Sequence, residues 1–196
     1  AILGFAQLME LDTELADEHQ DSLKEIMRAG DHLLGLINQV LDLAKIESGH
    51  FNLSVEPVVV DPLVAESFAL VNTLAARRSI EMRYRGRVSE VVAADQTRLK
   101  QALLNLLSNA IKYNREGGRI DVELQDAQDG MLRILVADTG RGIPTDRLPE
   151  LFQPFNRLSA ETSEIEGTGI GLNITRRLVE LMGGTVDASS EEGVGS

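Results

Sequence analysis

The stretch DQTRLKQALLNLLSNAIKY, residues 95–113, carries the pattern from which the fold of this chain can be argued. Apolar residues recur on one side at helical spacing: Leu99, Leu103, Leu106, Leu107 and Ala110. Asn105, Asn109 and Lys112 lie at i, i+4 and i+7, within roughly 60° of one another on the other side. The pattern predicts a helix that packs on a core and turns two carboxamides and an ammonium outward. A solvated polar face explains this triplet about as well as a site where amide oxygens and a lysine meet Mg²⁺ and phosphates.

Strand-like and helical segments alternate around this helix from residue 51 to the end. Helices are predicted at 61–78 and 170–182, and strands at VEPVVV (55–60), IEMRYR (80–85), RIDVELQ (119–125), MLRILVAD (131–138) and TVDASS (185–190). The pair Asp129-Gly130 between two strands indicates a hairpin. Together these segments predict an α+β fold in which helices cover a mixed sheet.

The first 50 residues have a different sequence pattern, which predicts two helices. The first helix begins in mid-pattern, so we expect it to start upstream of residue 1, and the second runs to about Ser48 with Gly49 ending it. The second helix carries a coiled-coil seam flanked by a further stripe: Leu23, Ile26, Gly30, Leu33, Ile37, Val40 and Ala44, with Met27, Leu34 and Leu41 beside them. Such a wide apolar face predicts a four-helix bundle formed by two copies, and therefore a homodimer through residues 1–48. The expected domains are a helical hairpin at 1–50 and an α+β sandwich at 51–196.

Composition excludes several classes of protein. The formal net charge of −12 argues against broad binding to nucleic acid or to an anionic membrane, which needs clustered Lys and Arg. No apolar run approaches the roughly 18 residues that span a bilayer, and no secretion signal opens the chain. Without cysteine there is no thiol chemistry, and an anionic ligand must be held by local groups.

Two glycine-containing segments follow the central helix. In DTGRGIP, residues 138–144, an aspartate ends a buried strand, and Gly140 and Gly142 would let the backbone approach a ligand closely. In EGTGIGL, residues 166–172, glycines precede a helix whose free N–H groups favour anions. A plain turn and a flexible loop account for these segments nearly as well. Between them lies LFQPFNRLSAETSEIE, residues 151–166, which looks like a mobile lid.

The segments NLLSNAIKYN, DTGRGIP, LFQPFNRL and GTGIGL, in this order and spacing, resemble the N, G1, F and G2 boxes of histidine kinases. The resemblance covers residues 55 to the end, and the helices before it resemble the dimerisation and phosphotransfer domain of that family. It implies the Bergerat (GHKL) fold, with ATP and Mg²⁺ as cofactors. It also implies a response-regulator receiver domain as partner and a cytoplasmic location, in a protein that upstream segments can anchor in a membrane.

The resemblance further implies a nucleotide site made of Asn105, Asn109, Lys112, Tyr113, Asp138, Gly140, Gly142, Ile143, Arg157, Gly167, Thr168, Gly169, Gly171 and Leu172. Within it, Asn109 would coordinate Mg²⁺ and Lys112 would contact a phosphate. Tyr113 would line the site, and Asp138 would accept a hydrogen bond from the adenine amino group. The glycines around Thr168 would hold the lid against the phosphates.

Two features of the sequence shape the functional hypothesis. Related ATPases of this fold carry a glutamate at the position of Asn105, and because an amide is no general base at neutral pH, hydrolysis is disfavoured and transfer to an acceptor is favoured. The family's phosphoacceptor box H-E-x-R-T-P is absent, and His19, His32 and His50 lack its surroundings. No acceptor or other catalytic residue is therefore identified, and both ends of the chain look trimmed. The leading hypothesis is the Mg²⁺-ATP-binding core of a histidine kinase with its acceptor upstream. The alternative is a pseudokinase or scaffold that dimerises and binds partners.

Overall fold

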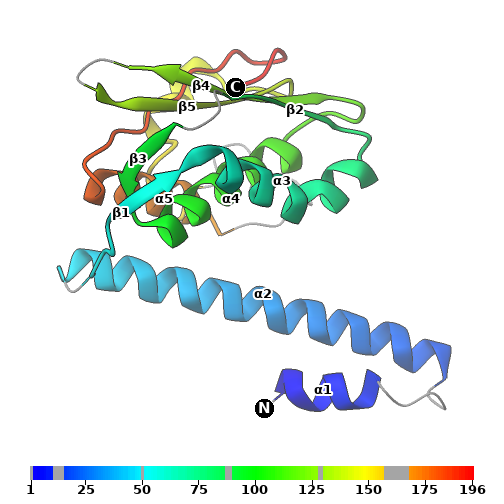
Figure 1. Cartoon of the computed structure of the whole chain (residues 1–196). Helices are drawn as coiled ribbons and strands as arrows, with labels where there is room; N and C mark the ends of the chain where they lie inside the picture. The colour runs from blue at the N-terminus through cyan, green and yellow to red at the C-terminus, as the bar shows by residue number, and fades with distance from the viewer. Residues whose placement is uncertain (1, 11–15, 50, 87–89, 128–129, 157–167) are drawn as a thin grey trace. The chain divides into compact units, whose positions relative to one another are not determined.

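A computed structural model describes residues 2–10, 16–49, 51–86, 90–127, 130–156 and 168–196. The chain forms two compact units, residues 1–51 and residues 52–196 (Figure 1). The predicted turn around Asp12 to Asp17 falls largely outside the described residues, as do His50, Asp129, Arg157 and Gly167 and most of the predicted lid. No described helix is long and apolar enough to cross a bilayer.

The first unit consists of α1 (Ile2–Glu10) and α2 (Asp17–Glu47). Gly30 allows the two helices to approach closely, because a Cβ at this position would lie only 2.5 Å from Leu3 Cδ2. Ala6 and Leu23 are buried in this unit. Helix α2 ends where the Ser48 N–H donates to the Ala44 carbonyl, and Gly49 follows with a φ of +71°.

Most of the apolar seam of this unit is exposed. Large apolar side chains that remain open to solvent lie on both helices: Ile2, Phe5, Leu8, Met9, Ile26, Leu33, Leu34, Ile37, Val40 and Leu41. A contiguous apolar stripe of this kind marks an interaction surface rather than an ordinary solvated helix face.

The second unit contains two small sheets. Strands β1 (Glu56–Val59) and β3 (Val91–Ala94) pair antiparallel. Strand β4 (Arg119–Asp126) is central in the other sheet, parallel to β2 (Glu81–Arg85) and antiparallel to β5 (Leu132–Asp138). The helices are α3 (Val60–Arg77), α4 (Gln96–Lys112) and α5 (Gly171–Leu181), with a 3₁₀ helix η2 (Thr145–Glu150). Figure 1 shows α3 and α4 on one side of the three-stranded sheet, so the predicted mixed sheet covered by helices is confirmed.

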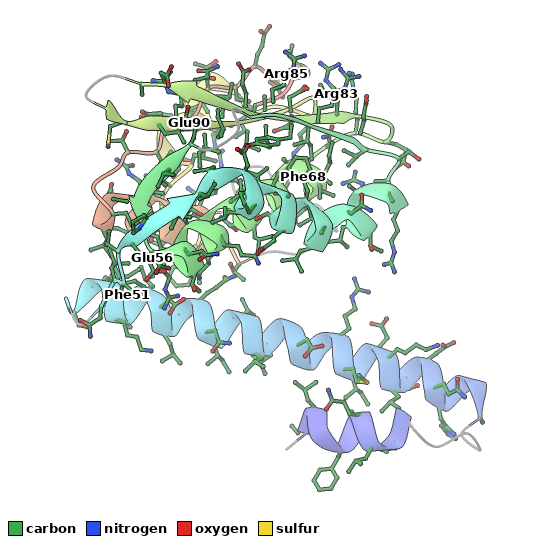
Figure 2. The ribbon with its side chains drawn as sticks, viewed as in Figure 1. Phe51, Glu56, Phe68, Arg83, Arg85 and Glu90 are labelled. Carbon is green, nitrogen blue, oxygen red and sulfur yellow. The ribbon has the colours of Figure 1, made fainter. Side chains whose placement is uncertain are left out.

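Alternation along β4 explains why one face of this sheet carries the core. Ile120, Val122 and Leu124 are buried, whereas the residues between them point to the other face. The buried face packs on Leu103, Leu107 and Ile111 of α4 and on Leu63 and Val64 of α3: these residues form one hydrophobic cluster. Figure 2 shows Arg83 and Arg85 of β2 pointing away from the helices, on the polar outer face.

Helix α4 begins at a side-chain cap. Asp95 Oδ1 accepts a hydrogen bond of 3.0 Å from the Arg98 N–H, as expected of an N-cap aspartate. Asp95 Oδ2 accepts a second bond of 3.0 Å, from the Ser54 N–H. The cap therefore also fastens the segment before β1 to the start of the helix that carries the predicted site.

One predicted strand was wrong, and one strand was missed. Residues 185–190 form no strand, and at the end of β5 the Asp138 N–H donates instead to the Ser196 carbonyl, 2.8 Å away. The chain instead turns back on itself through the bridge between Glu191 and Gly195. Strand β3 was not predicted, since its four residues are too few to show alternation and its pairing with β1 is non-local.

Candidate nucleotide-binding site

Asn105 joins α4 to the start of α5. Its Nδ2 donates a hydrogen bond of 2.8 Å to Thr175 Oγ1, and Thr175 is itself buried. On the other side of the amide, a Cβ on Gly171 would lie 2.4 Å from Asn105 Oδ1. Gly171 is therefore required by the close approach of α5 to α4, and the Asn105 amide is committed to this contact.

Asn109 lies one turn further along α4 and is half-buried. Within the described residues, its side chain has no hydrogen-bond partner, so its carboxamide oxygen is available to a ligand. The described residues contain no cluster of three or more histidines and carboxylates that would hold a metal by itself. A single amide oxygen fits a Mg²⁺ ion that takes its other ligands from phosphates and water.

Tyr113, the C-cap residue of α4, is flanked by two cations. Lys112 Nζ lies 5.2 Å from the centroid of its ring, and Arg141 Cζ lies 4.7 Å from it. Both distances are within the range of cation–π attraction. The Arg141 N–H also donates to the Tyr113 carbonyl at 3.2 Å. The ring is thus held against the loop that follows β5.

Asp138 ends β5 and organises this loop. Its Oδ1 accepts a 2.7 Å hydrogen bond from the Gly140 N–H, and a Cβ on Gly140 would lie 2.5 Å from the Tyr113 carbonyl oxygen. Glycine is therefore needed where the loop meets the end of α4. Partial burial raises the pKa of the Asp138 carboxyl above its ordinary value, although the backbone N–H groups of Gly140 and Ser196 act in the opposite direction.

The C-terminal residues brace the same loop from behind. Gly142 has a φ of +67°, and a Cβ there would lie 2.0 Å from the Glu191 carbonyl oxygen. The Ile143 N–H donates to Ser190 Oγ at 2.8 Å, and the Gly193 N–H donates to the Arg141 carbonyl at 2.7 Å. Gly142 is thus required by a turn of this chain, independently of any ligand. Sequence reasoning missed this role of residues 190–196, for which the glycines of GVGS were the available signal.

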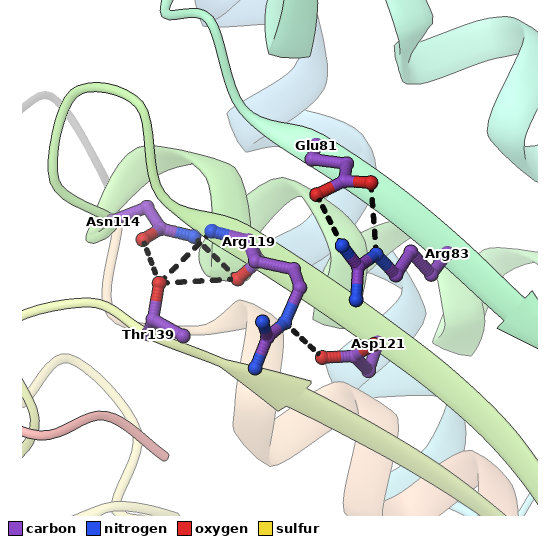
Figure 3. Close-up of polar contacts among 6 residues, drawn as sticks. All are labelled: Glu81, Arg83, Asn114, Arg119, Asp121 and Thr139. Carbon is purple, nitrogen blue, oxygen red and sulfur yellow. Dashed lines mark hydrogen bonds and ion pairs between the residues drawn. The ribbon is translucent and has the colours of Figure 1, made fainter.

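A polar network joins the end of α4 to this loop (Figure 3). The buried Asn114 donates from Nδ2 to the Arg119 carbonyl at 3.1 Å and accepts from Thr139 Oγ1 at 3.3 Å. Thr139 Oγ1 in turn accepts from the Arg119 N–H at 2.9 Å. Neither Asn114 nor Thr139 was singled out from the sequence, because their partnership depends on residues 25 positions apart.

The segment before residue 157 is fastened to the segment after residue 167. The Phe155 N–H donates to the Gly169 carbonyl at 3.0 Å, and a Cβ on Gly169 would lie 2.8 Å from the Phe155 carbonyl carbon. Asn173 Nδ2 donates to the Phe152 carbonyl at 2.9 Å, and Thr168 Oγ1 accepts from the Ile170 N–H. Leu172 follows in the first turn of α5, whose N-cap residue makes no side-chain cap.

The two glycine-containing segments of the predicted site therefore contact α4 at two points. Tyr113 contacts the loop at Gly140, Asn105 contacts Gly171, and Asn109 and Lys112 lie between these contacts along the helix. A hollow of about 490 Å³ is lined by β4, β5 and the C-terminal residues. Among the described residues of the predicted site, only Asp138 lines it, so this hollow lies apart from the α4 face. Arg157 and Gly167 are outside the described residues.

Comparison with protein families accounts for both units. The family described as "Histidine kinase-, DNA gyrase B-, and HSP90-like ATPase" matches residues 94–196. The family described as "His Kinase A (phospho-acceptor) domain" matches residues 1–49. The chain belongs to the sensor histidine kinases.

Two curated relatives align with the whole of this histidine kinase chain. Sensor histidine kinase GacS of Pseudomonas protegens is 38% identical over 202 residues, covering 100% of the chain and 22% of the relative. An uncharacterized sensor-like histidine kinase of Rhizobium meliloti is 37% identical over 203 residues, covering 100% of the chain and 38% of the relative. The chain thus spans less than half the length of these curated relatives.

Among solved structures, full-length ShkA in complex with AMPPNP is 33% identical to this kinase chain, with a TM-score of 0.84. The superposition covers 99% of the chain and 40% of ShkA. Its extent and identity support the expected GHKL fold, with helices followed by a mixed-sheet ATPase domain.

Proposed function

We propose that this chain is the Mg²⁺-ATP-binding catalytic part of a sensor histidine kinase. In this proposal it transfers a phosphoryl group to a histidine upstream of residue 1, for passage to an aspartate of a response-regulator receiver domain. The observation that carries the proposal is the position of Asn109. Its carboxamide, which has no hydrogen-bond partner among the described residues, lies on α4 between one glycine loop bonded to Tyr113 and another packed on Asn105.

Each end of this helix face suits a different part of the nucleotide. Asp138 would accept a hydrogen bond from the adenine amino group, beside the Tyr113 ring. Lys112 would contact the phosphates, and Asn109 would hold Mg²⁺ together with them. Bound Mg²⁺ would neutralise charge on the phosphates during transfer. The start of α5, whose N-cap residue makes no side-chain cap, suits an anion next to the loop at Gly169.

The amide side chain of Asn105 favours transfer of the phosphoryl group to an acceptor over hydrolysis of ATP. An amide cannot take a proton from an attacking water at neutral pH, and this amide is already bonded to Thr175. The position one turn before Asn109 is thus filled by a residue that holds α4 and α5 together.

We also propose a location and partners for this chain. The exposed apolar stripe of α1 and α2 would pair with a second copy to form a four-helix bundle, giving a homodimer through residues 1–48. A chain with these activities would work in the cytoplasm, where ATP and the receiver domain are found. We propose no contact of this chain with nucleic acid or with a membrane.

The test is nucleotide-dependent stabilisation. At a nucleotide concentration about 100 times Kd, binding adds roughly 2.7 kcal/mol to the free energy of unfolding. For a chain of this size that raises Tm by about 5–10 °C. We expect such a rise with ATP or ADP plus Mg²⁺, its loss in Asp138→Ala, and its retention in Asp146→Ala, which changes an exposed aspartate near the same loop. No rise for the unmutated chain at millimolar nucleotide would contradict the proposal and favour the scaffold alternative.

A further inference from the structure

Arg78 follows the last residue of α3, at a corner before β2. The backbone turns sharply there, since Ser79 has a φ of +51°. The side chain of Arg78 does not point to solvent but crosses to the C-terminal end of α4. Nη1 donates to the carbonyls of Ile111 and Lys112 at 2.5 and 2.8 Å, and Nη2 donates to the carbonyl of Asn114 at 2.7 Å.

The end of α4 needs such a partner. The last carbonyls of a helix have no partner within the helix, and together they carry a partial negative charge. A guanidinium is always charged and presents its donors in a rigid planar fork, so one side chain satisfies several carbonyls at once. The remaining carbonyl of this turn, that of Tyr113, accepts from the Arg141 N–H. All four carbonyls from residue 111 to residue 114 are thus bonded, three of them by Arg78.

These carbonyls belong to the turn that carries two residues of the proposed site. Lys112 is bonded directly, and Tyr113 lies between two residues that Arg78 holds. Asn114 links this helix end to the loop after β5, because its side chain is hydrogen-bonded to Thr139 in that loop. Arg78 therefore fixes the helix end against which the Asp138 loop is built.

We propose that Arg78 is a positioning residue that sets nucleotide affinity by holding the C-terminal turn of α4, without touching the nucleotide. This inference rests on the proposed nucleotide-binding function. It assigns a role to a residue outside the four sequence boxes and 33 positions away from the first carbonyl that it bonds.

The experiment compares the Kd of Mg²⁺-ADP, measured by calorimetry, in the unmutated chain, Arg78→Gln, Arg78→Lys and Arg83→Gln. Removal of hydrogen bonds from a charged donor is expected to weaken binding roughly tenfold in Arg78→Gln. Arg78→Lys keeps the charge but lacks the planar fork, so we expect it to recover only part of the affinity. Arg83→Gln is the matched control, because Arg83 pairs with Glu81 on the exposed outer face, and it should bind as the unmutated chain does.

Amide hydrogen exchange supplies a readout that a general loss of stability would not give. In both Arg78 variants, exchange should rise at residues 111–116 and stay unchanged at the buried amides of β4. If Arg78→Gln does not fold, Arg78→Lys carries the test alone. Unmutated affinity in Arg78→Lys, or in a folded Arg78→Gln, would overturn the inference and leave the proposed function intact. Failure of the unmutated chain to bind ADP would overturn both.

Discussion

The proposed role of Asp138 in binding adenine opposes its effect on the stability of the unliganded chain. Its carboxyl is partly buried at the end of β5, and burial raises its pKa. A group whose pKa is raised on folding favours the folded chain while protonated, and this contribution is lost as pH rises through the folded-state pKa. At neutral pH the ionised Asp138 therefore destabilises the unliganded chain, as is common at functional sites.

Asp138→Asn should separate the two effects. The asparagine oxygen can still accept from the Gly140 N–H, and the buried charge is gone, so the unliganded variant should have a higher urea midpoint at neutral pH. The gain should shrink as pH falls through the raised pKa of Asp138, where the unmutated chain becomes neutral too. Stabilisation by ADP should vanish, because an amide N–H₂ would face the adenine amino group. An unchanged ADP response in Asp138→Asn would contradict the assigned role.

At the scale of elements, α4 is held at both ends by groups outside its own sequence. Its N-terminus is capped by Asp95, which also binds the Ser54 N–H, and its C-terminus is bonded by Arg78 and Arg141. Burial of Asp95 would raise its pKa, but the N–H groups of Ser54 and Arg98 outweigh burial, and the pKa lies below its ordinary value. The ionised cap therefore stabilises the fold.

Asp95→Ala should lower the free energy of unfolding at neutral pH by about 0.5–2 kcal/mol, the usual range for a lost N-cap. Asp95→Asn should cost less, because it keeps one acceptor for Arg98 but offers the Ser54 N–H no second oxygen. The difference between Asp95→Ala and the unmutated chain should fall as pH drops below the ordinary value of 3.8 and through the lowered pKa. Denaturant unfolding measures both trends. Gln96→Ala is the control, and an equal loss there would count against the cap.

At the scale of the whole molecule, the exposed apolar stripe predicts self-association. The side chains of Leu33 and Ile37 are 57% and 47% exposed, which is unusual for large aliphatic residues at seam positions. Leu70 on α3 is as exposed, at 61%, but belongs to the other unit. It therefore provides a matched surface leucine.

Light scattering should find a dimer for the unmutated chain. Leu33→Glu should weaken dimerisation at least about a hundredfold, since roughly 1.5–3 kcal/mol per buried leucine is lost from both copies. Leu70→Glu should leave the dimer intact. A monomer at high concentration, or equal effects of the two substitutions, would argue against a bundle formed through residues 1–48.

Local patterns in the sequence determined the class of this fold and the family. Apolar spacing in residues 95–113 predicted α4, strand-like segments on either side of Asp129-Gly130 predicted β4 and β5, and four ordered segments indicated histidine kinases. Each of these signals is carried by neighbouring residues, whose periodicity follows from the geometry of one helix or strand.

Only the tertiary structure decided which neighbours these elements meet. It bonded Asn105 to Thr175, placed the Glu191 carbonyl against Gly142, brought Arg78 to the end of α4, and left residues 185–190 without a strand to pair with. Such contacts join residues far apart in the chain and depend on backbone approach within a few ångströms. A sequence pattern predicts which residues lie on one face of a helix or strand. Tertiary packing determines which groups contact that face.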